Sequence, residues 1–145
     1  MQRLVSHRVL TALVLTAVVG MSAACDSTAT PSPASPAAAI STETFSGTFN
    51  QLGSASHSFT VAATGPVEIK LTDIQPLATM ALAVDLGTAL GTTCVGSTVT
   101  NDHAKKGVIA LSGTATAGAY CIRVYDAGNI PQDGSVTYSI DVVHP

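Results

Sequence analysis

Hydrophobic and polar residues alternate along most of the chain beyond residue 43, in short runs separated by glycine and proline. The clearest runs are Val67 to Leu71 and Val136 to Val142, where every second residue is apolar. A period of two is typical of a β-strand with one buried face. Similar runs lie at Phe45 to Phe49, His57 to Val61, Ile109 to Leu111 and Tyr120 to Val124. We therefore predict that residues 43–145 form an all-β domain, a single antiparallel β-sandwich of the jelly-roll kind.

Two segments do not show this pattern clearly. In residues 76–90 the apolar positions fit a strand and a helix equally well, and Pro76 could begin a helix. We favour a strand there because the neighbouring segments are strands. Residues 91–107 are the least regular part of the domain, and we expect them to include a long loop.

The N-terminal segment has a different organisation. Arg3 and Arg8 precede an uncharged run of 13 residues, Val9 to Met21. As a helix this run would be about 20 Å long, which is short of the roughly 30 Å hydrocarbon core of a bilayer. Small residues follow and lead into Cys25. A positive end, a short apolar run and a small-residue cleavage site predict a secretory signal peptide over residues 1–24.

The segment Met21-Ser22-Ala23-Ala24-Cys25 resembles the lipobox of bacterial lipoproteins. Ser22 departs from the leucine that the family prefers at that position. The resemblance implies that Cys25 is diacylated and becomes the first residue of an exported protein, held in the lipid bilayer at the bacterial cell membrane or cell surface. The alternatives are cleavage after Ala24 without lipidation, and an uncleaved anchor.

Residues 25–42 contain the lipidated cysteine of this interpretation and a stretch rich in proline, serine and alanine. Ile40 is its single bulky apolar residue. Such a composition cannot bury enough surface to fold by itself and favours extended conformations. We interpret this stretch as a disordered tether between the lipid and the β domain.

A second resemblance covers most of the domain. The segments Gly118 to Asp126 and Tyr138 to Val142 are similar to the closing strands of bacterial pre-peptidase C-terminal domains. Residues 49–69 resemble the opening strands of the same family. The resemblance implies a small jelly-roll-like sandwich, which is usually an accessory module of a secreted enzyme. No enzyme accompanies it in this chain.

Charge and cysteine content narrow the possible roles. The chain has 6 basic and 9 acidic residues, and removal of residues 1–24 takes away Arg3 and Arg8, so the net charge changes from 6 − 9 = −3 to 4 − 9 = −5. An acidic chain with so few basic residues does not suit nucleic-acid binding.

With Cys25 lipidated, Cys94 and Cys121 remain as a pair in an exported domain, and we expect them to form a disulfide.

We find no sequence motif for catalysis and predict that the protein is not an enzyme. His57 is expected to face inward or to end a strand, His103 to lie in a solvated loop, and His144 to be frayed at the chain end. Asp126, Asn129 and Asp133 are weak candidates for calcium ligands, because calcium prefers oxygen donors. Turn formation explains these three residues better, so we predict no cofactor or metal site.

The sequence thus predicts a membrane-anchored lipoprotein. Its β-sandwich would act as a non-catalytic binding or structural module at the bacterial cell envelope, with an envelope protein or a glycan as its unidentified partner. The alternative is an accessory module that assists the secretion or folding of a separate partner. A small hydrolase with an unrecognised site is a less favoured third possibility.

Overall fold

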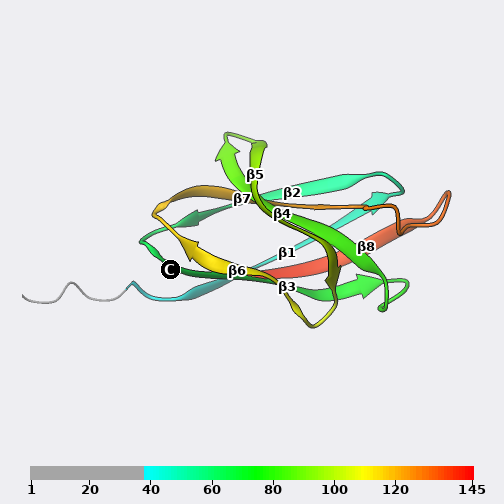
Figure 1. Cartoon of the computed structure of the whole chain (residues 1–145), viewed down its shortest axis with the longest axis horizontal. Helices are drawn as coiled ribbons and strands as arrows, with labels where there is room; N and C mark the ends of the chain where they lie inside the picture. The colour runs from blue at the N-terminus through cyan, green and yellow to red at the C-terminus, as the bar shows by residue number, and fades with distance from the viewer. Residues whose placement is uncertain (1–37) are drawn as a thin grey trace, which may run out of the picture. The chain divides into compact units, whose positions relative to one another are not determined.

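The computed structural model describes residues 38–145, which form eight strands arranged in two sheets (Figure 1). The predicted signal peptide, Cys25 and most of the predicted tether lie outside the described residues. The strands are β1 (Ser41–Asn50), β2 (Ser54–Val61), β3 (Gly65–Gln75), β4 (Ala81–Leu90), β5 (Thr93–Lys105), β6 (Ile109–Ala115), β7 (Gly118–Tyr125) and β8 (Ser135–His144). The first strand thus begins two residues before the domain boundary predicted at residue 43.

The strand order is that of a jelly roll. One sheet has the order β1-β8-β3-β6 and the other β2-β7-β4-β5. All neighbouring strands pair in the antiparallel direction. Only the β4–β5 connection stays within one sheet, and every other connection crosses between the two sheets. The prediction of an all-β antiparallel sandwich is confirmed.

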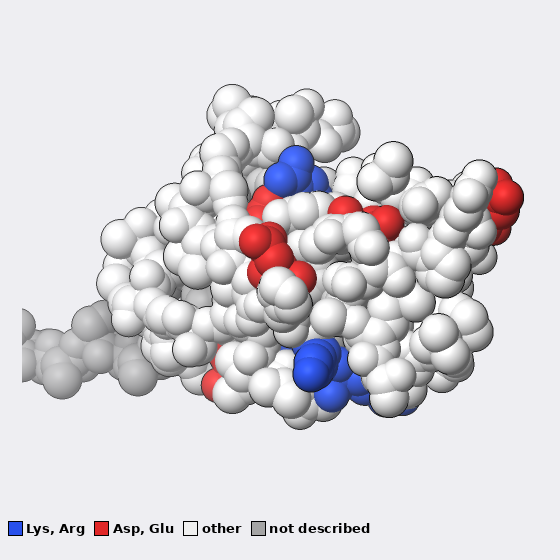
Figure 2. Space-filling model, turned by 45° about the vertical axis from the view of Figure 1, so that its right-hand side comes forward, with Lys and Arg blue, Asp and Glu red and all other residues white. Residues whose placement is uncertain are grey.

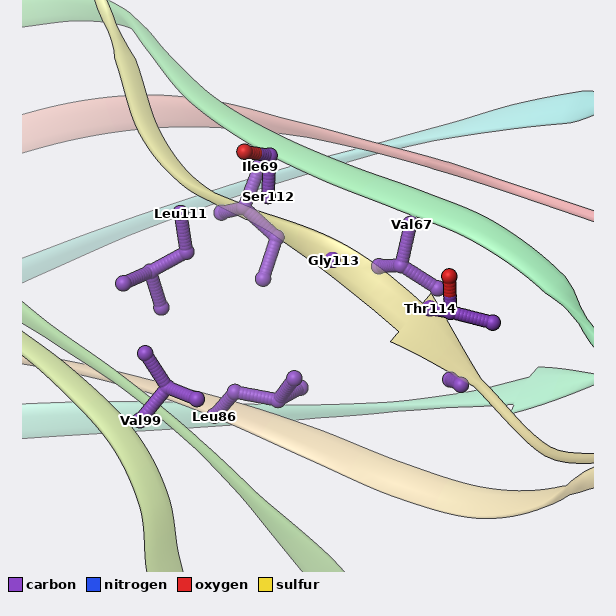
Figure 3. A pocket seen from close by; sticks show the side chains of 9 residues that line it. Val67, Ile69, Leu86, Val99, Leu111, Ser112, Gly113 and Thr114 are labelled. Atoms are coloured by element: carbon purple, nitrogen blue, oxygen red, sulfur yellow. The ribbon is translucent and has the colours of Figure 1, made fainter.

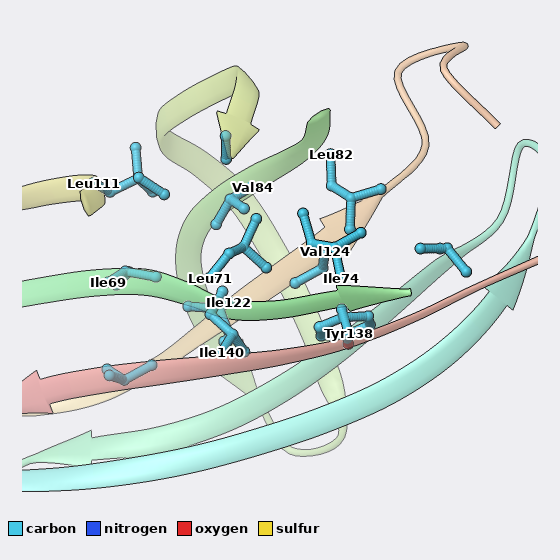
Figure 4. Close-up of a cluster of buried hydrophobic side chains, with 14 of the residues drawn as sticks. Ile69, Leu71, Ile74, Leu82, Val84, Leu111, Ile122, Val124, Tyr138 and Ile140 are labelled. Carbon is cyan, nitrogen blue, oxygen red and sulfur yellow. The ribbon is translucent and has the colours of Figure 1, made fainter. Parts of the chain in front are cut away.

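The core lies between the two sheets and is built from the alternating apolar residues (Figure 4). Val67, Ile69 and Leu71 on β3 are at most 4% exposed, and the inward residues of β8 are equally well buried. Opposite them lie the inward residues of the second sheet. Fully buried side chains of that sheet include Val61, Leu82, Val84, Ile122 and Val124. The period-two pattern therefore identifies the buried face correctly in most strands.

The segment 76–90 contains strand β4, as favoured from its neighbours, and no helix. β4 lies between β7 and β5 in its sheet, and consecutive residues of the strand are buried, so positions on both of its faces are covered. Leu82 and Val84 face the core, while Ala83 and Asp85 are also buried. Burial on both faces explains why the sequence shows no clean alternation in this segment.

The expectation of a long loop in residues 91–107 is wrong, because Thr93–Lys105 form β5, the longest strand. β5 is an edge strand, and most of its residues are exposed on both faces. Its pairing with β4 is interrupted by three register shifts. An exposed and irregular edge strand needs no alternating pattern, so the sequence carries no strand signal there.

The expectation that His144 is frayed is also wrong. His144 is the last residue of β8 and is only 3% exposed. Its Nε2 atom lies 2.9 Å from Oε1 of Glu43, and its ring packs against Phe59. The main-chain oxygen of Pro145 accepts a hydrogen bond from the N–H of Ala62. These contacts attach the last two residues to β1 and to the end of β2.

Within residues 38–145, no helix is long and apolar enough to span a bilayer.

Candidate functional site

Cys94 and Cys121 form the predicted disulfide, with a Cα–Cα distance of 5.6 Å. They lie on β5 and β7, which are separated by β4 in the sheet. The bridge therefore crosses the outer side of β4 at Gly87. A Cβ atom on Gly87 would lie 3.3 Å from the Cys94 sulfur and 2.3 Å from the carbonyl oxygen of Gly96. The main chain of β5 and, more weakly, the bridge therefore leave no room for a side chain at position 87, a dependence that the sequence did not reveal.

An apolar slot of about 70 Å³ opens between the two sheets on the side where β5 and β6 form the edges (Figure 3). We define the slot by its lining, which comes from four strands. The lining residues are Val67, Ile69, Leu86, Val99, Leu111, Ser112, Gly113, Thr114 and Ala115. In Figure 3, Leu86 and Val99 approach from one sheet, and Leu111 and Val67 from the other. None of these side chains is titratable, so the slot offers apolar contact and no acid or base.

Gly113 lies in the β6 wall of the slot and is itself exposed. It pairs in register with the buried residue Val67, so both positions face the sandwich interior. On β6 its neighbours on the same face, Leu111 and Ala115, are buried. A Cβ atom built on Gly113 would have no protein atom within 4 Å, and its φ angle lies outside the left-handed region. An ordinary side chain would therefore fit there without strain. Glycine inside a strand often marks a place where another group approaches closely.

We expect Gly113→Val to stabilise the fold. The valine would fill apolar space and raise strand propensity, for a gain of about 1–2 kcal/mol in the free energy of unfolding. The matched control is Gly118→Val, because a Cβ atom there meets only the Tyr120 ring at 3.7 Å and the position is exposed. Urea denaturation of both variants would measure the difference. Equal effects of the two substitutions would contradict an open slot at Gly113.

The lysines of the chain lie near the start of β6, before the residues that line the slot. Lys105 ends β5, Lys106 lies in the turn that leads to β6, and Lys70 pairs in register with Ile109, the first residue of β6. These three residues are all the lysines of the chain. Lys106 forms an ion pair with Asp73, while Lys105 has no carboxylate within ion-pair distance among residues 38–145. Figure 2 shows a group of basic side chains at the bottom of the view. We call these three residues the lysine cluster.

Asp126, a weak calcium candidate, serves as an organiser of the β7–β8 loop. Its Oδ1 atom accepts hydrogen bonds from the backbone N–H groups of Gly128, Asn129 and Ile130, at 2.7–3.1 Å. Its Oδ2 atom accepts one from the N–H of Leu52 in the β1–β2 turn. Burial raises the pKa of Asp126, but the four N–H donors together lower it below its ordinary value. Both carboxylate oxygens are thus used to hold two loops.

The other two calcium candidates also have local roles. The Asn129 side chain donates to the carbonyl oxygen of Ala81 at the start of β4. Asp133 has a positive φ angle of 58°, and Gly134 closes a turn by donating to the carbonyl of Pro131. Within residues 38–145, no group of three or more His, Cys, Asp or Glu residues could hold a metal ion. These contacts agree with the turn-forming interpretation of the three residues.

His57 lies between the sheets, where it is partly buried. Its Nε2 atom is 2.7 Å from the hydroxyl oxygen of Tyr138, and its ring stacks on Phe45 at 5.0 Å. Burial lowers the pKa of His57 below its ordinary value of 6.5. A neutral ring can accept the Tyr138 O–H at Nε2, which gives that buried hydroxyl its partner.

The His57 environment predicts a pH dependence of stability. Because the pKa is lower in the folded state, the unfolded chain binds more protons between that pKa and 6.5. The free energy of unfolding should therefore fall as the pH decreases through 6.5, and His57→Gln should remove this part of the dependence. Chemical denaturation between pH 7.5 and 5 would measure it. An unchanged slope in His57→Gln would show that other groups are responsible.

His103 lies on β5, and a charged cluster of Asp85, Arg123 and Asp102 lies on the same sheet. The backbone N–H of His103 donates to the Asn101 side chain, and His103 is exposed. Buried Asp85 forms an ion pair with Arg123, which lies over the Tyr125 ring at 4.8 Å from its centre. The Tyr125 hydroxyl donates to Asp102 at 3.1 Å. Neither His57 nor His103 has both an Asp and a Ser as side-chain partners within residues 38–145.

The geometry defines a jelly-roll sandwich with an apolar slot at its open side. A comparison of the chain with known protein families and with curated protein sequences finds no significant match.

Proposed function

We propose that the protein is a lipoprotein of the bacterial cell envelope, held in the membrane through acylated Cys25, and that its β-sandwich is a non-catalytic binding module. The lipobox-like segment and the proline-rich stretch support the anchoring. The slot around Gly113 supports binding, and it is the observation that carries this part of the proposal.

The slot supports binding because its open space makes no contribution to the stability of the fold. The core strands of the sandwich bury their inward apolar residues almost completely. At Gly113 a larger side chain would fit and would remove exposed apolar surface from water. Val99 and, in part, Leu86 instead keep apolar surface open toward solvent. A pre-formed apolar site of this kind is typical of a binding surface.

The surroundings of the slot support a role without catalysis. General acid–base chemistry needs a titratable group within hydrogen-bond reach of the ligand. The polar side chains of the lining are the hydroxyls of Ser112 and Thr114. The partly buried His57 is engaged with Tyr138 in the core. The slot can therefore hold a ligand but has no side chain suited to transfer a proton.

Metabolic labelling with a radioactive fatty acid tests the anchoring. The wild-type chain should carry the label and partition into the membrane fraction, because two acyl chains hold a protein stably in a bilayer. Cys25→Ala should carry no label. Cys94→Ala serves as the matched control, because it removes a cysteine that we assign to a disulfide. Persistent labelling of Cys25→Ala, or an unlabelled wild type, would contradict the anchoring.

A further inference from the structure

The edge of β6 next to the slot has no charged residue and no proline, and its one irregularity lies at its start. β6 is the last strand of its sheet, so one side of its main chain faces no neighbouring strand. Its sequence Ile-Ala-Leu-Ser-Gly-Thr-Ala contains no charge and no proline. Natural edge strands are commonly protected by lysine, by proline or by bulges that twist them away. β6 has one register shift, at its start, where the Asn101 side chain binds the carbonyl of Ala110.

The slot opens along this same edge. Residues 111–115 of β6 form one wall, and Leu86 and Val99 of the other sheet form the opposite wall. Val99 is 48% exposed, so the mouth of the slot is apolar. A volume of about 70 Å³ is roughly half that of a cavity that binds benzene. The slot therefore suits one aliphatic side chain and is too small and too apolar for a sugar ring.

The lysine cluster lies at the beginning of the same strand. Lys105 and Lys106 precede Val108 and Ile109 in the chain, and Lys70 pairs with Ile109; Val108 and Ile109 are 59% and 46% exposed. Asp73 neutralises part of this charge through its ion pair with Lys106. Neither Lys70 nor Lys105 forms an ion pair among residues 38–145, although Asp141 on β8 lies opposite Lys70. A partner that lies along β6 would meet this cluster with an acidic group.

These three features fit one occupant. We propose that β6 binds an extended segment of a partner protein by strand addition, with an aliphatic side chain in the slot at Gly113 and an acidic side chain at the lysine cluster. Gly113 and Ile109 are four residues apart, which is about 13 Å along a strand. The partner's aliphatic and acidic residues are therefore separated by about four positions. This inference rests on the proposed binding function and specifies its partner.

Strand addition explains how a shallow slot gives useful affinity. The main-chain groups of the partner pair with those of β6, and the slot and the lysines select its side chains. Removal of the slot should weaken binding by at least ~10-fold, since burial of one aliphatic side chain contributes about 1.5–3 kcal/mol. Removal of positive charge should weaken binding more at low ionic strength than at high ionic strength.

Selection from a displayed library of random peptides against the purified protein tests the proposal. We expect enriched peptides that carry an aliphatic residue and an Asp or Glu about four positions apart. Fluorescence anisotropy with the enriched peptides should show weaker binding to Gly113→Val and to the double variant Lys105→Glu, Lys106→Glu. Gly118→Val is the matched control and should bind like the wild type. Circular dichroism would verify that each variant is folded.

Three results would overturn strand addition. The first is the absence of enriched peptides. The second is equal affinity of the peptides for the wild type and for Gly113→Val. The third is binding of the wild type to a neutral glycan on a glycan array, if Gly113→Val does not bind that glycan. The third result would leave the proposed binding function intact. If the immobilised protein bound neither peptides nor glycans and captured no component of an envelope extract, the proposed binding function itself would fail.

Discussion

Replacement of Cys94 and Cys121 by alanine is expected to lower the free energy of unfolding by about 3.5 kcal/mol. The disulfide closes a loop of 27 residues, and the value follows from the entropy that this closure removes from the unfolded chain. Small domains have a net stability of about 5–15 kcal/mol, so the loss is a large fraction of the total. Urea denaturation of the double variant against the oxidised wild type measures the loss.

The disulfide also holds β5 against the rest of its sheet. Cys94 lies at the start of β5, where the pairing with β4 is interrupted by register shifts. The bridge attaches this irregular strand to β7, across Gly87. We therefore expect amide hydrogen exchange in β5 to accelerate more than in β3 or β8 when the bridge is absent.

Addition of a reductant provides the control for the double variant. It should destabilise the wild type and leave the Cys94→Ala, Cys121→Ala variant unchanged. A loss smaller than about 1 kcal/mol in the double variant would contradict the stabilising role of the bridge.

Asp126→Ala is expected to lower the free energy of unfolding by about 3 kcal/mol. The substitution leaves four backbone N–H donors without their carboxylate partner, and the donor of Ile130 is buried. Hydrogen bonds to a charged acceptor contribute about 1.5–3 kcal/mol each, and water can replace only part of this set. Asp126 is itself only 8% exposed, so solvent has limited access to the site.

The charge of Asp126 gives this prediction a second measurement. The pKa of Asp126 is lowered in the folded state, so its contribution to stability is present above the ordinary value of 3.8 and is lost as the pH falls through the folded pKa. Asp126→Ala should reduce the acid sensitivity of the fold. Asp133→Asn is a suitable control, because Asp133 is an exposed loop residue without such a set of hydrogen bonds, and asparagine tolerates its positive φ angle. Similar losses in the two variants would contradict the organising role of Asp126.

The sequence predicted those parts of the fold in which one face of a strand is buried. β3, β7 and β8 alternate clearly because their inward residues pack between the sheets and their outward residues meet solvent. β5 could not be predicted in this way, because it is exposed on both faces and irregularly paired. The burial of His144 depends on its contact with Glu43, about a hundred residues earlier in the chain, and no local pattern reports such a contact.

The candidate site could not be predicted from the sequence for a related reason. The chain has 12 glycines, and only the three-dimensional structure shows that Gly113 lines the slot and has room for a side chain. The slot is formed by residues of four strands that are distant in sequence. The disulfide was predictable because an even pair of cysteines in a domain predicted to be exported has few other uses.

Stability and binding are expected to change in opposite directions at Gly113. A side chain that fills the slot improves packing and at the same time excludes the ligand. Such opposite effects are common where a site is left open for function. A purely structural role for this region would instead give a gain in stability without any loss of binding.

The most direct test of the binding module is capture of envelope proteins by the purified wild type, Gly113→Val and Gly118→Val, followed by quantitative mass spectrometry. We expect at least one envelope protein to be retained by the wild type and by Gly118→Val and to be lost with Gly113→Val, although Gly113→Val is the more stable variant. Retention of the same proteins in equal amounts by all three would contradict binding in the slot.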